Sequence, residues 1–183
     1  MSLNNLLLHG PDLTSSLISV LMKFRLENIT LMSDIQSTSY QVRVIRQDID
    51  CPRFIWWPSG DLNHKPLVYR MLVHLFCATS SLACAHVALR RTAQDNSHLF
   101  VPEVCELIFS HFYVDDFLKS VSNKEQDLSV LQEVTELCSK GGFKLTKWIS
   151  NRRSVIQTVS VEERAKAIKV LDLMKDDLPA GRA

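Results

Sequence analysis

Two adjacent aspartates, Asp115 and Asp116, stand inside an otherwise apolar run of the sequence that includes Leu107-Ile108-Phe109. Burying an unpaired carboxylate costs on the order of several kcal/mol, so a buried strand does not carry two of them in its middle. A tight turn at Val114-Asp115 resolves the conflict, because it places both carboxylates at the tip of a hairpin over residues 106–121. An Asp-rich turn that is exposed to solvent and has no further role produces the same pattern.

A third acidic residue, Asp34, ends a short apolar segment that we predict to be a buried strand over residues 29–32. The alternative interpretation is that Asp34 caps the helix that follows it. If this strand neighbours the hairpin in one sheet, three carboxylates meet at the same end of the sheet. Hard cations take oxygen ligands, and three such groups suit a two-metal site that catalyses phosphoryl displacement.

The rest of the chain alternates between helical and extended patterns, without repeats or low-complexity segments. Antiparallel strands with helices packed on one face predict an α+β fold. In chain order we first predict a helix over 13–24, the strand over 29–32, an alternating segment over 40–44 and a hairpin from 53–57 and 68–76. A helix from Ser80 or Ser81 to about Ala93 and the hairpin over 106–121 follow. The last predicted elements are a helix that opens at the capping box 122–125 and stops at Gly141-Gly142, a strand over 143–149 and an amphipathic helical tail over 161–174.

Composition excludes several classes of protein. With 46% hydrophobic and 22% charged residues the chain has the content of a folded core, and its net charge of +1 gives no support for nucleic-acid binding. Five scattered cysteines without a CxxC pair argue against zinc and against a disulfide framework, and favour reduced thiols in an intracellular protein. We expect no signal peptide and no membrane span, because the uncharged stretch 71–89 is too polar to cross a bilayer.

Several segments, in order along the chain, resemble the reverse transcriptase of Bel/Pao-type LTR retrotransposon polyproteins, over about residues 2–182. The box Tyr113-Val114-Asp115-Asp116 carries the resemblance most directly. The other matching segments are Ser2-Leu3-Asn4-Asn5-Leu6-Leu7-Leu8-His9-Gly10-Pro11-Asp12-Leu13, Asp34-Ile35 with Tyr40-Gln41-Val42-Arg43-Val44, Arg53-Phe54-Ile55-Trp56-Trp57-Pro58, Ala78-Thr79-Ser80-Ser81 with Ala88-Leu89-Arg90-Arg91-Thr92-Ala93, and Gly141-Gly142-Phe143-Lys144-Leu145-Thr146-Lys147-Trp148.

The resemblance implies an RNA-directed DNA polymerase palm with part of the fingers. Asp34, Asp115 and Asp116 would hold two Mg²⁺ ions, for which Mn²⁺ is a substitute, with help from the Ile35 carbonyl. A primer 3′-hydroxyl, paired to an RNA or DNA template, would attack the α-phosphate of a deoxynucleotide. The implied nucleotide-binding residues are Ser39, Tyr40, Cys77, Tyr113 and Lys147.

Some of these positions have plainer interpretations. Lys147 would neutralise the departing pyrophosphate, but a solvated strand lysine fits as well. Arg90 and Arg91 fit a solvated helix face before they fit a phosphate contact. The three tryptophans fit core packing better than base stacking.

The resemblance also implies boundaries and partners. It places fingers residues at about 2–28 and 46–76, palm residues at about 29–45 and 77–160, and a helical tail over 161–183 that leads toward a missing primer grip and thumb. The thumb, RNase H and integrase regions of the polyprotein would be partners, in a cytoplasmic particle or the nucleus, and no membrane is involved.

Three positions depart from the family pattern. Ser39 stands where a bulky aromatic residue excludes ribonucleotides, Cys77 where a glycine lets the backbone approach the nucleotide, and Leu82 where a proline starts a helix. These changes indicate a decayed copy. By family standards the chain is also expected to be truncated, with negligible activity as an isolated fragment. The alternatives are a non-catalytic retroelement remnant that binds nucleic acid weakly at most, and an unrelated α+β interaction domain with a chance acidic turn.

Overall fold

The structure is a computed structural model that describes the backbone of residues 2–165 and their side chains except those of 124–127. The chain divides into two compact units. Unit 1 comprises Met1–Leu13 and Ser37–Ala88, and unit 2 comprises Thr14–Gln36 and Leu89–Ala183. The α+β class predicted from the sequence is confirmed, because the described residues form two antiparallel sheets together with helices.

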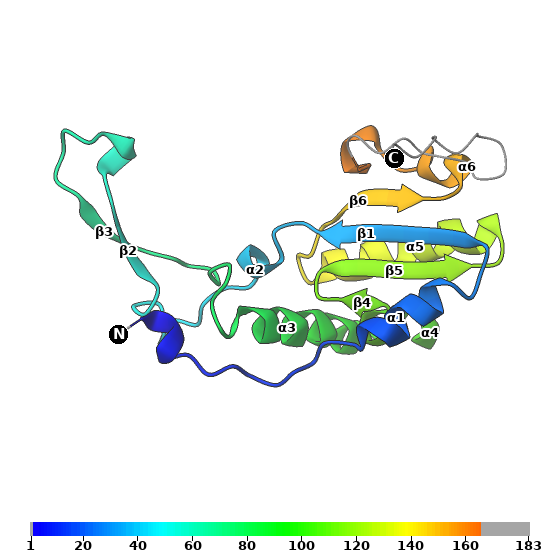
Figure 1. The fold of residues 1–183 in the computed structure, drawn as a ribbon, viewed down its shortest axis with the longest axis horizontal. Coiled ribbons are helices and arrows are strands. Elements are labelled where there is room, and N and C mark those ends of the chain that lie inside the picture. Colours follow the sequence, from blue (N-terminus) through cyan, green and yellow to red (C-terminus); the bar gives the residue numbers. More distant parts are fainter. Residues whose placement is uncertain (1, 166–183) are drawn as a thin grey trace, which may run out of the picture. The chain divides into compact units, whose positions relative to one another are not determined.

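Unit 2 is built on a four-stranded antiparallel sheet with the strand order β4-β5-β1-β6 (Figure 1). Its strands are β1 (Ile29–Ile35), β4 (Phe112–Tyr113), β5 (Asp116–Val121) and β6 (Leu145–Ser150). Every second residue of β1 is buried, as expected of a strand whose alternate side chains face the core. β1 pairs with β5 on one side and with β6 on the other, so the residue that ends it lies between two partner strands.

Helices complete the core of unit 2. α5 (Lys124–Lys140) packs against β1, β5 and β6, while α1 (Leu17–Phe24) packs against β4 and β5. α4 (Pro102–Ser110) contacts α5, and α6 (Arg153–Ile156) and the 3₁₀ turn η3 (Val161–Glu163) follow β6. The largest fully buried side chains are Trp148, Phe117, Phe143, Leu31, Ile35, Leu137 and Leu145.

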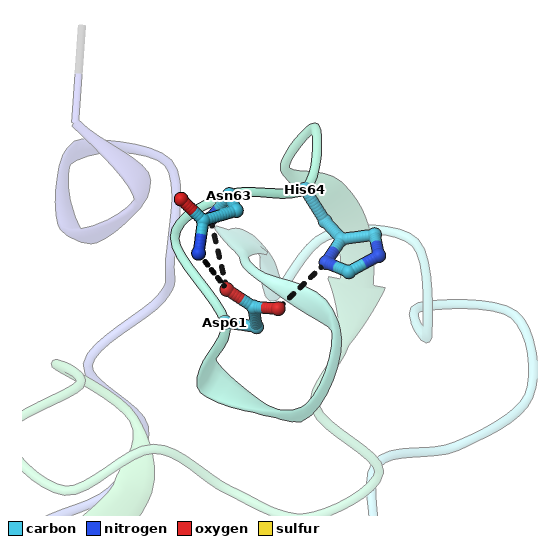
Figure 2. A network of polar contacts seen from close by, with 3 residues as sticks. All are labelled: Asp61, Asn63 and His64. Atoms are coloured by element: carbon cyan, nitrogen blue, oxygen red, sulfur yellow. Dashed lines mark hydrogen bonds and ion pairs between the residues drawn. The ribbon is translucent and has the colours of Figure 1, made fainter.

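Unit 1 contains a two-stranded hairpin, β2 (Arg53–Trp56) with β3 (Leu67–Arg70), whose residues are mostly exposed. The loop between the strands includes the 3₁₀ turn η2 (Pro58–Gly60) and a small polar network (Figure 2). In it, Asp61 Oδ1 accepts hydrogen bonds from the Asn63 backbone N–H at 3.0 Å and from Asn63 Nδ2 at 2.9 Å, and Asp61 Oδ2 lies 3.0 Å from His64 Nδ1. The backbone hydrogen bond from Asn63 is the main cause that lowers the pKa of Asp61. This network is a local turn stabiliser.

The remaining elements of unit 1 are short. They are the 3₁₀ turn η1 (Leu3–Asn5), the helical turn α2 (Thr38–Gln41) and the first part of α3 (Ser81–Asp95), which continues into unit 2. The Asn4 side chain joins η1 to the loop before α3. Its Nδ2 donates to the Cys77 carbonyl at 3.2 Å, and its Oδ1 accepts the Thr79 backbone N–H at 3.1 Å.

Two sequence predictions of extended structure were wrong in their bounds. Leu107-Ile108-Phe109 lies in α4, because Pro102 at the first turn favours a helix start and Val104, Leu107 and Ile108 form one buried helical face. The hairpin therefore covers only Phe112–Val121. The segment predicted over 68–76 is a regular strand only to Arg70, although Val73 forms an isolated antiparallel bridge with Arg43. The alternating segment over 40–44 begins within the helical turn α2.

Other boundaries moved by a few residues. The first helix begins at Leu17 rather than residue 13, β1 extends to Ile35, and β6 begins at Leu145 rather than residue 143. The tail predicted as a helix from residue 161 opens with the 3₁₀ turn η3, and its part from residue 166 onward lies outside the described residues. Among the helices of residues 2–165, none combines the length and the hydropathy that crossing a membrane requires.

Candidate functional site

The turn between β4 and β5 carries the acidic pair. Tyr113 pairs with Asp116 across the hairpin, so Val114 and Asp115 form a two-residue loop, as predicted. Val114 has φ +57°, which is unusual for a β-branched residue and marks a strained position. The Asp115 carbonyl accepts the Ile35 N–H at 2.9 Å, which fastens the turn to the end of β1.

Asp34 lies directly across from Asp116. The two residues are register partners on the adjacent antiparallel strands β1 and β5, so their side chains share one face of the sheet. Burial raises the pKa of Asp116, and the charges of Asp115 and Asp34 raise it further, while Lys147 acts in the opposite direction. The prediction that the strands of Asp34 and of the acidic turn are neighbours is therefore confirmed.

A β-bulge in β6 brings Lys147 to the same place. Asp34 pairs with Thr146 and Met32 pairs with Ile149, so Lys147 and Trp148 together oppose Ser33. Lys147 takes φ +55°, and its ammonium forms a hydrogen-bonded ion pair with the Asp34 carboxylate. The hydrogen bond to Asp34, and then the charge of Asp34, raise the pKa of Lys147.

Trp148, the second residue of the bulge, lies in the core. It is 2% exposed and packs edge-on against Phe117, with 6.1 Å between the ring centroids. Phe117 directly follows Asp116 in β5, so a buried aromatic pair adjoins the charged residues Asp116 and Lys147 in sequence. The bulge therefore points two adjacent side chains to different places: Trp148 packs in the core, and Lys147 reaches Asp34.

The structure gathers six of the nine predicted site residues in unit 2. They are Asp34, Ile35, Tyr113, Asp115, Asp116 and Lys147. Ser39 and Tyr40 on α2, and Cys77 in the loop before α3, belong to unit 1, so their place relative to the carboxylates stays a prediction.

The donor set suits a hard divalent cation, because it consists of carboxylate oxygens. In the described part of the chain, however, no group of three or more His, Cys, Asp or Glu side chains is positioned to hold a metal ion. The Asp34 carboxylate is instead engaged by the Lys147 ammonium. The metal site implied by the resemblance therefore stays a prediction.

Two features of the site were not predicted, the bulge and the ion pair that it creates. The sequence contains a signal for the bulge. The buried residues of this segment are Phe143, Leu145, Trp148 and Ser150, so the period of two breaks between Leu145 and Trp148. On one face of a sheet, a strand can bury residues of both parities only by inserting an extra residue.

The other residues considered from sequence have structural roles in unit 2. The Arg90 guanidinium lies 5.4 Å from the centre of the Phe109 ring, and Arg91 pairs with Asp95 on the helix surface at 2.8 Å. A cavity of about 320 Å³ lies between α5 and residues 158–163, with Trp148 in its wall. None of the nine predicted site residues lines it.

Comparison with known proteins finds a match in structure only. No model of a protein family matches the chain, and no curated protein matches it. Among solved structures, the foamy viral protease-reverse transcriptase in complex with an RNA/DNA hybrid matches with a TM-score of 0.54 and 13% identity. The match covers 72% of this chain and 15% of the foamy viral chain. At this identity the likeness concerns the fold alone, and the chain has a reverse-transcriptase-like fold.

Proposed function

We propose that this chain is the palm, with part of the fingers, of an RNA-directed DNA polymerase from a Bel/Pao-type retrotransposon, in a decayed copy. The observation that carries the proposal is the pairing of Asp34 with Asp116 beside the Val114-Asp115 turn. These residues are distant in the sequence, and the sheet brings them to one end. The reverse-transcriptase-like fold and the order of the matching segments support the same conclusion.

In the proposed reaction a primer 3′-oxygen forms a bond to the α-phosphorus of a deoxynucleotide. The bond between the α-phosphorus and the bridging oxygen breaks, pyrophosphate leaves, and the hydroxyl proton passes to water. Asp34, Asp115 and Asp116 would hold two Mg²⁺ ions, which stabilise the attacking and the leaving oxygens when bound. Lys147 would balance the negative charge of the pyrophosphate, and the Ile35–Asp115 hydrogen bond keeps the acidic turn beside β1.

The second candidate function is that of a non-catalytic remnant with weak nucleic-acid binding at most. The ion pair between Lys147 and Asp34 favours it, because one of the proposed metal ligands is already engaged. Ser39 and Cys77 favour it as well, since both depart from the implied family pattern at the nucleotide pocket.

Divalent-cation binding tests the proposal. Mn²⁺ is titrated into the full 183-residue chain and free Mn²⁺ is followed by electron paramagnetic resonance. We expect binding that Asp115→Asn abolishes and that Asp95→Asn, a surface carboxylate paired with Arg91, leaves unchanged. Equal binding by the unmodified chain and by Asp115→Asn would remove the metal site and with it the proposed mechanism.

Primer extension separates the two candidates further. On a poly(rA) template with an oligo(dT) primer and Mg²⁺ or Mn²⁺, the isolated chain should show negligible incorporation. Nucleic acid is held by contacts spread over a wide surface, and this chain spans 15% of the matching polymerase chain. Robust extension that depends on Asp115 would show an intact enzyme and contradict the proposed decay.

A further inference from the structure

The ion pair between Lys147 and Asp34 is created by the backbone as well as by the side chain. In a regular strand the residue opposite Ser33 would share its face, which is the buried face of β1. The bulge gives that buried place to Trp148 and frees Lys147 to turn toward Asp34. Because the Trp148 ring is fixed in the core against Phe117, the register that produces this arrangement is fixed too.

The backbone conformation of Lys147 indicates that the position of its side chain is functional. A lysine with φ +55° lies in the left-handed region, which residues with a Cβ disfavour, and such strain persists only where the surroundings impose it. Strained residues and bulges concentrate at functional sites, where they redirect a side chain. Here the redirected side chain supplies a positive charge to three carboxylates.

We propose that the Lys147 ammonium is a built-in counter-ion of the acidic site, which occupies Asp34 and must leave it before a divalent cation binds there. The inference rests on the proposed function and adds a regulation of the same site. Side-chain exposure is 67% for Lys147 and 22% for Asp34, so the ammonium can move into water while the carboxylate stays in place. Exposed ion pairs are weak, which makes this competition easily reversible.

Linkage fixes the direction of the effect. If a cation and the ammonium exclude one another at Asp34, removal of the ammonium tightens cation binding, and cation binding releases the ammonium to the same extent. Since the pair is exposed, we expect the change in affinity to be roughly two- to fivefold.

The chain offers a matched control for this test. Lys144 lies three residues before Lys147, is exposed, and pairs with Glu163 at 3.5 Å rather than with an acid of the site. Lys144→Met removes the same charge from the same segment as Lys147→Met, but it leaves the contact with Asp34 intact. A difference in Mn²⁺ affinity between the two variants therefore reports the loss of the contact with Asp34 and not the change in net charge.

The experiment titrates Mn²⁺ into the full chain and into both variants, with electron paramagnetic resonance as the readout. We expect Lys147→Met to bind Mn²⁺ roughly two- to fivefold tighter than the unmodified chain, and Lys144→Met to differ little from it. Lys147→Gly, which suits the left-handed backbone, is the second variant in case the methionine form folds poorly. Equal or weaker binding by the Lys147 variants, or an equal gain in Lys144→Met, would overturn the inference while leaving the proposed function in place.

A spectroscopic measurement checks the reciprocal effect. In the chain labelled with ¹³C at lysine Cε, the Lys147 signal is identified by its loss in Lys147→Met. Added Mg²⁺ should shift that signal toward the position of a solvated lysine, and the Lys144 signal should stay where it is. If no variant binds cations in an Asp115-dependent way, the proposed function fails and the competition fails with it. If cations bind but the Lys147 signal does not move, only the competition is wrong.

Discussion

Cys77 holds a backbone conformation that glycine adopts more easily. Its φ is +63°, in the left-handed region, and its carbonyl is fixed there by the hydrogen bond from Asn4 Nδ2. By resemblance, this is also the position where a glycine is expected. We predict that Cys77→Gly raises the free energy of unfolding by roughly 0.5–1 kcal/mol, because the relief of strain exceeds the entropy that glycine adds to the unfolded chain.

Urea unfolding followed by the fluorescence of Trp56 and Trp57 in a Trp148→Phe background measures this change, because Cys77 and both tryptophans belong to unit 1. Cys51 is the control, because it is also an exposed cysteine and its φ is not in the left-handed region. Cys51→Gly should leave stability unchanged or lower it. A loss of stability in Cys77→Gly similar to that in Cys51→Gly would show that the left-handed conformation carries no cost in this loop.

His111 links stability to pH. It lies between α4 and β4, is 9% exposed, and has its Nδ1 2.8 Å from the Ser110 hydroxyl. Burial is the main cause that lowers its pKa to about 4, and the charges of Lys119 and Lys23 add to the effect. The unfolded chain, with an ordinary histidine pKa of about 6.5, binds a proton first as the pH falls. The free energy of unfolding should therefore fall between about pH 6.5 and pH 4, on the order of 2 kcal/mol for this group.

Urea unfolding at several pH values in this window isolates the contribution of His111. His111→Gln should flatten the pH dependence, since glutamine does not titrate. The exposed His98, changed to Gln, is the control and should leave the slope as it is. Identical slopes in the unmodified chain and in His111→Gln would mean that His111 is protonated equally in the folded and unfolded states.

At the residue scale, the sequence predicted what depends on the cost of burying charge. That cost placed Asp115 at a turn, and the apolar segment before Asp34 placed that residue at a strand end; the structure confirms both positions. It could not predict the contact between Lys147 and Asp34. That contact depends on the bulge in β6. The bulge in turn depends on which side chains of β6 pack in the core.

The two glycines that end α5 serve different purposes, which can be tested separately. A Cβ added at Gly141 would lie 2.0 Å from Thr92 Oγ1 of α3, so this residue is small because another helix is close. A Cβ at Gly142 would meet nothing within 4 Å, but its φ is +79°. Gly141→Ala should cost roughly 1–3 kcal/mol through overpacking, and Gly142→Ala about 1 kcal/mol through backbone strain.

A double-mutant cycle with Thr92→Ala distinguishes these causes. Urea unfolding should show that Thr92→Ala recovers part of the loss in Gly141→Ala, because it removes the nearest atom of the clash. The same change should add independently to Gly142→Ala. Equal coupling of both glycines to Thr92 would contradict the separation of space from conformation.

At the element scale, predictions succeeded where a local signal marks the boundary. Gly141-Gly142 marked the end of α5 correctly, and the helix predicted to run to about Ala93 is α3, which ends at Asp95. The prediction failed where one apolar run fits two structures. Residues 107–109 are strand-like in composition, and only the helix start at Pro102 shows that their spacing is helical.

For the molecule as a whole, the hydrophobic core is unevenly divided. Among the described residues, Ala85 and Pro52 are the only apolar residues buried in unit 1, whereas all other buried apolar side chains belong to unit 2. Unit 1 also exposes large apolar side chains on its hairpin, including Ile55 and Val68, which are cross-strand partners and each 65% exposed. A two-stranded hairpin without a buried face is marginally stable.

This division predicts two unfolding transitions in place of one. Unit 1 should unfold at a lower urea concentration than unit 2, because burial of apolar surface is the main source of folding free energy. The tryptophans report on the units separately. Trp56 and Trp57 lie in or next to β2 of unit 1, and Trp148 lies in the core of unit 2. Fluorescence of a Trp56→Phe, Trp57→Phe variant therefore follows unit 2 alone, and fluorescence of Trp148→Phe follows unit 1 alone.

We expect the midpoint reported by Trp56 and Trp57 to precede the midpoint reported by Trp148. Trp148→Phe keeps an aromatic ring against Phe117, so the sheet of unit 2 should remain folded while unit 1 is measured. Far-UV circular dichroism of both variants is the control, and its main change should coincide with the Trp148 signal, since most helices and the larger sheet lie in unit 2. Coincident midpoints from all three probes would show that the chain unfolds as one cooperative unit, and would contradict the separate transitions.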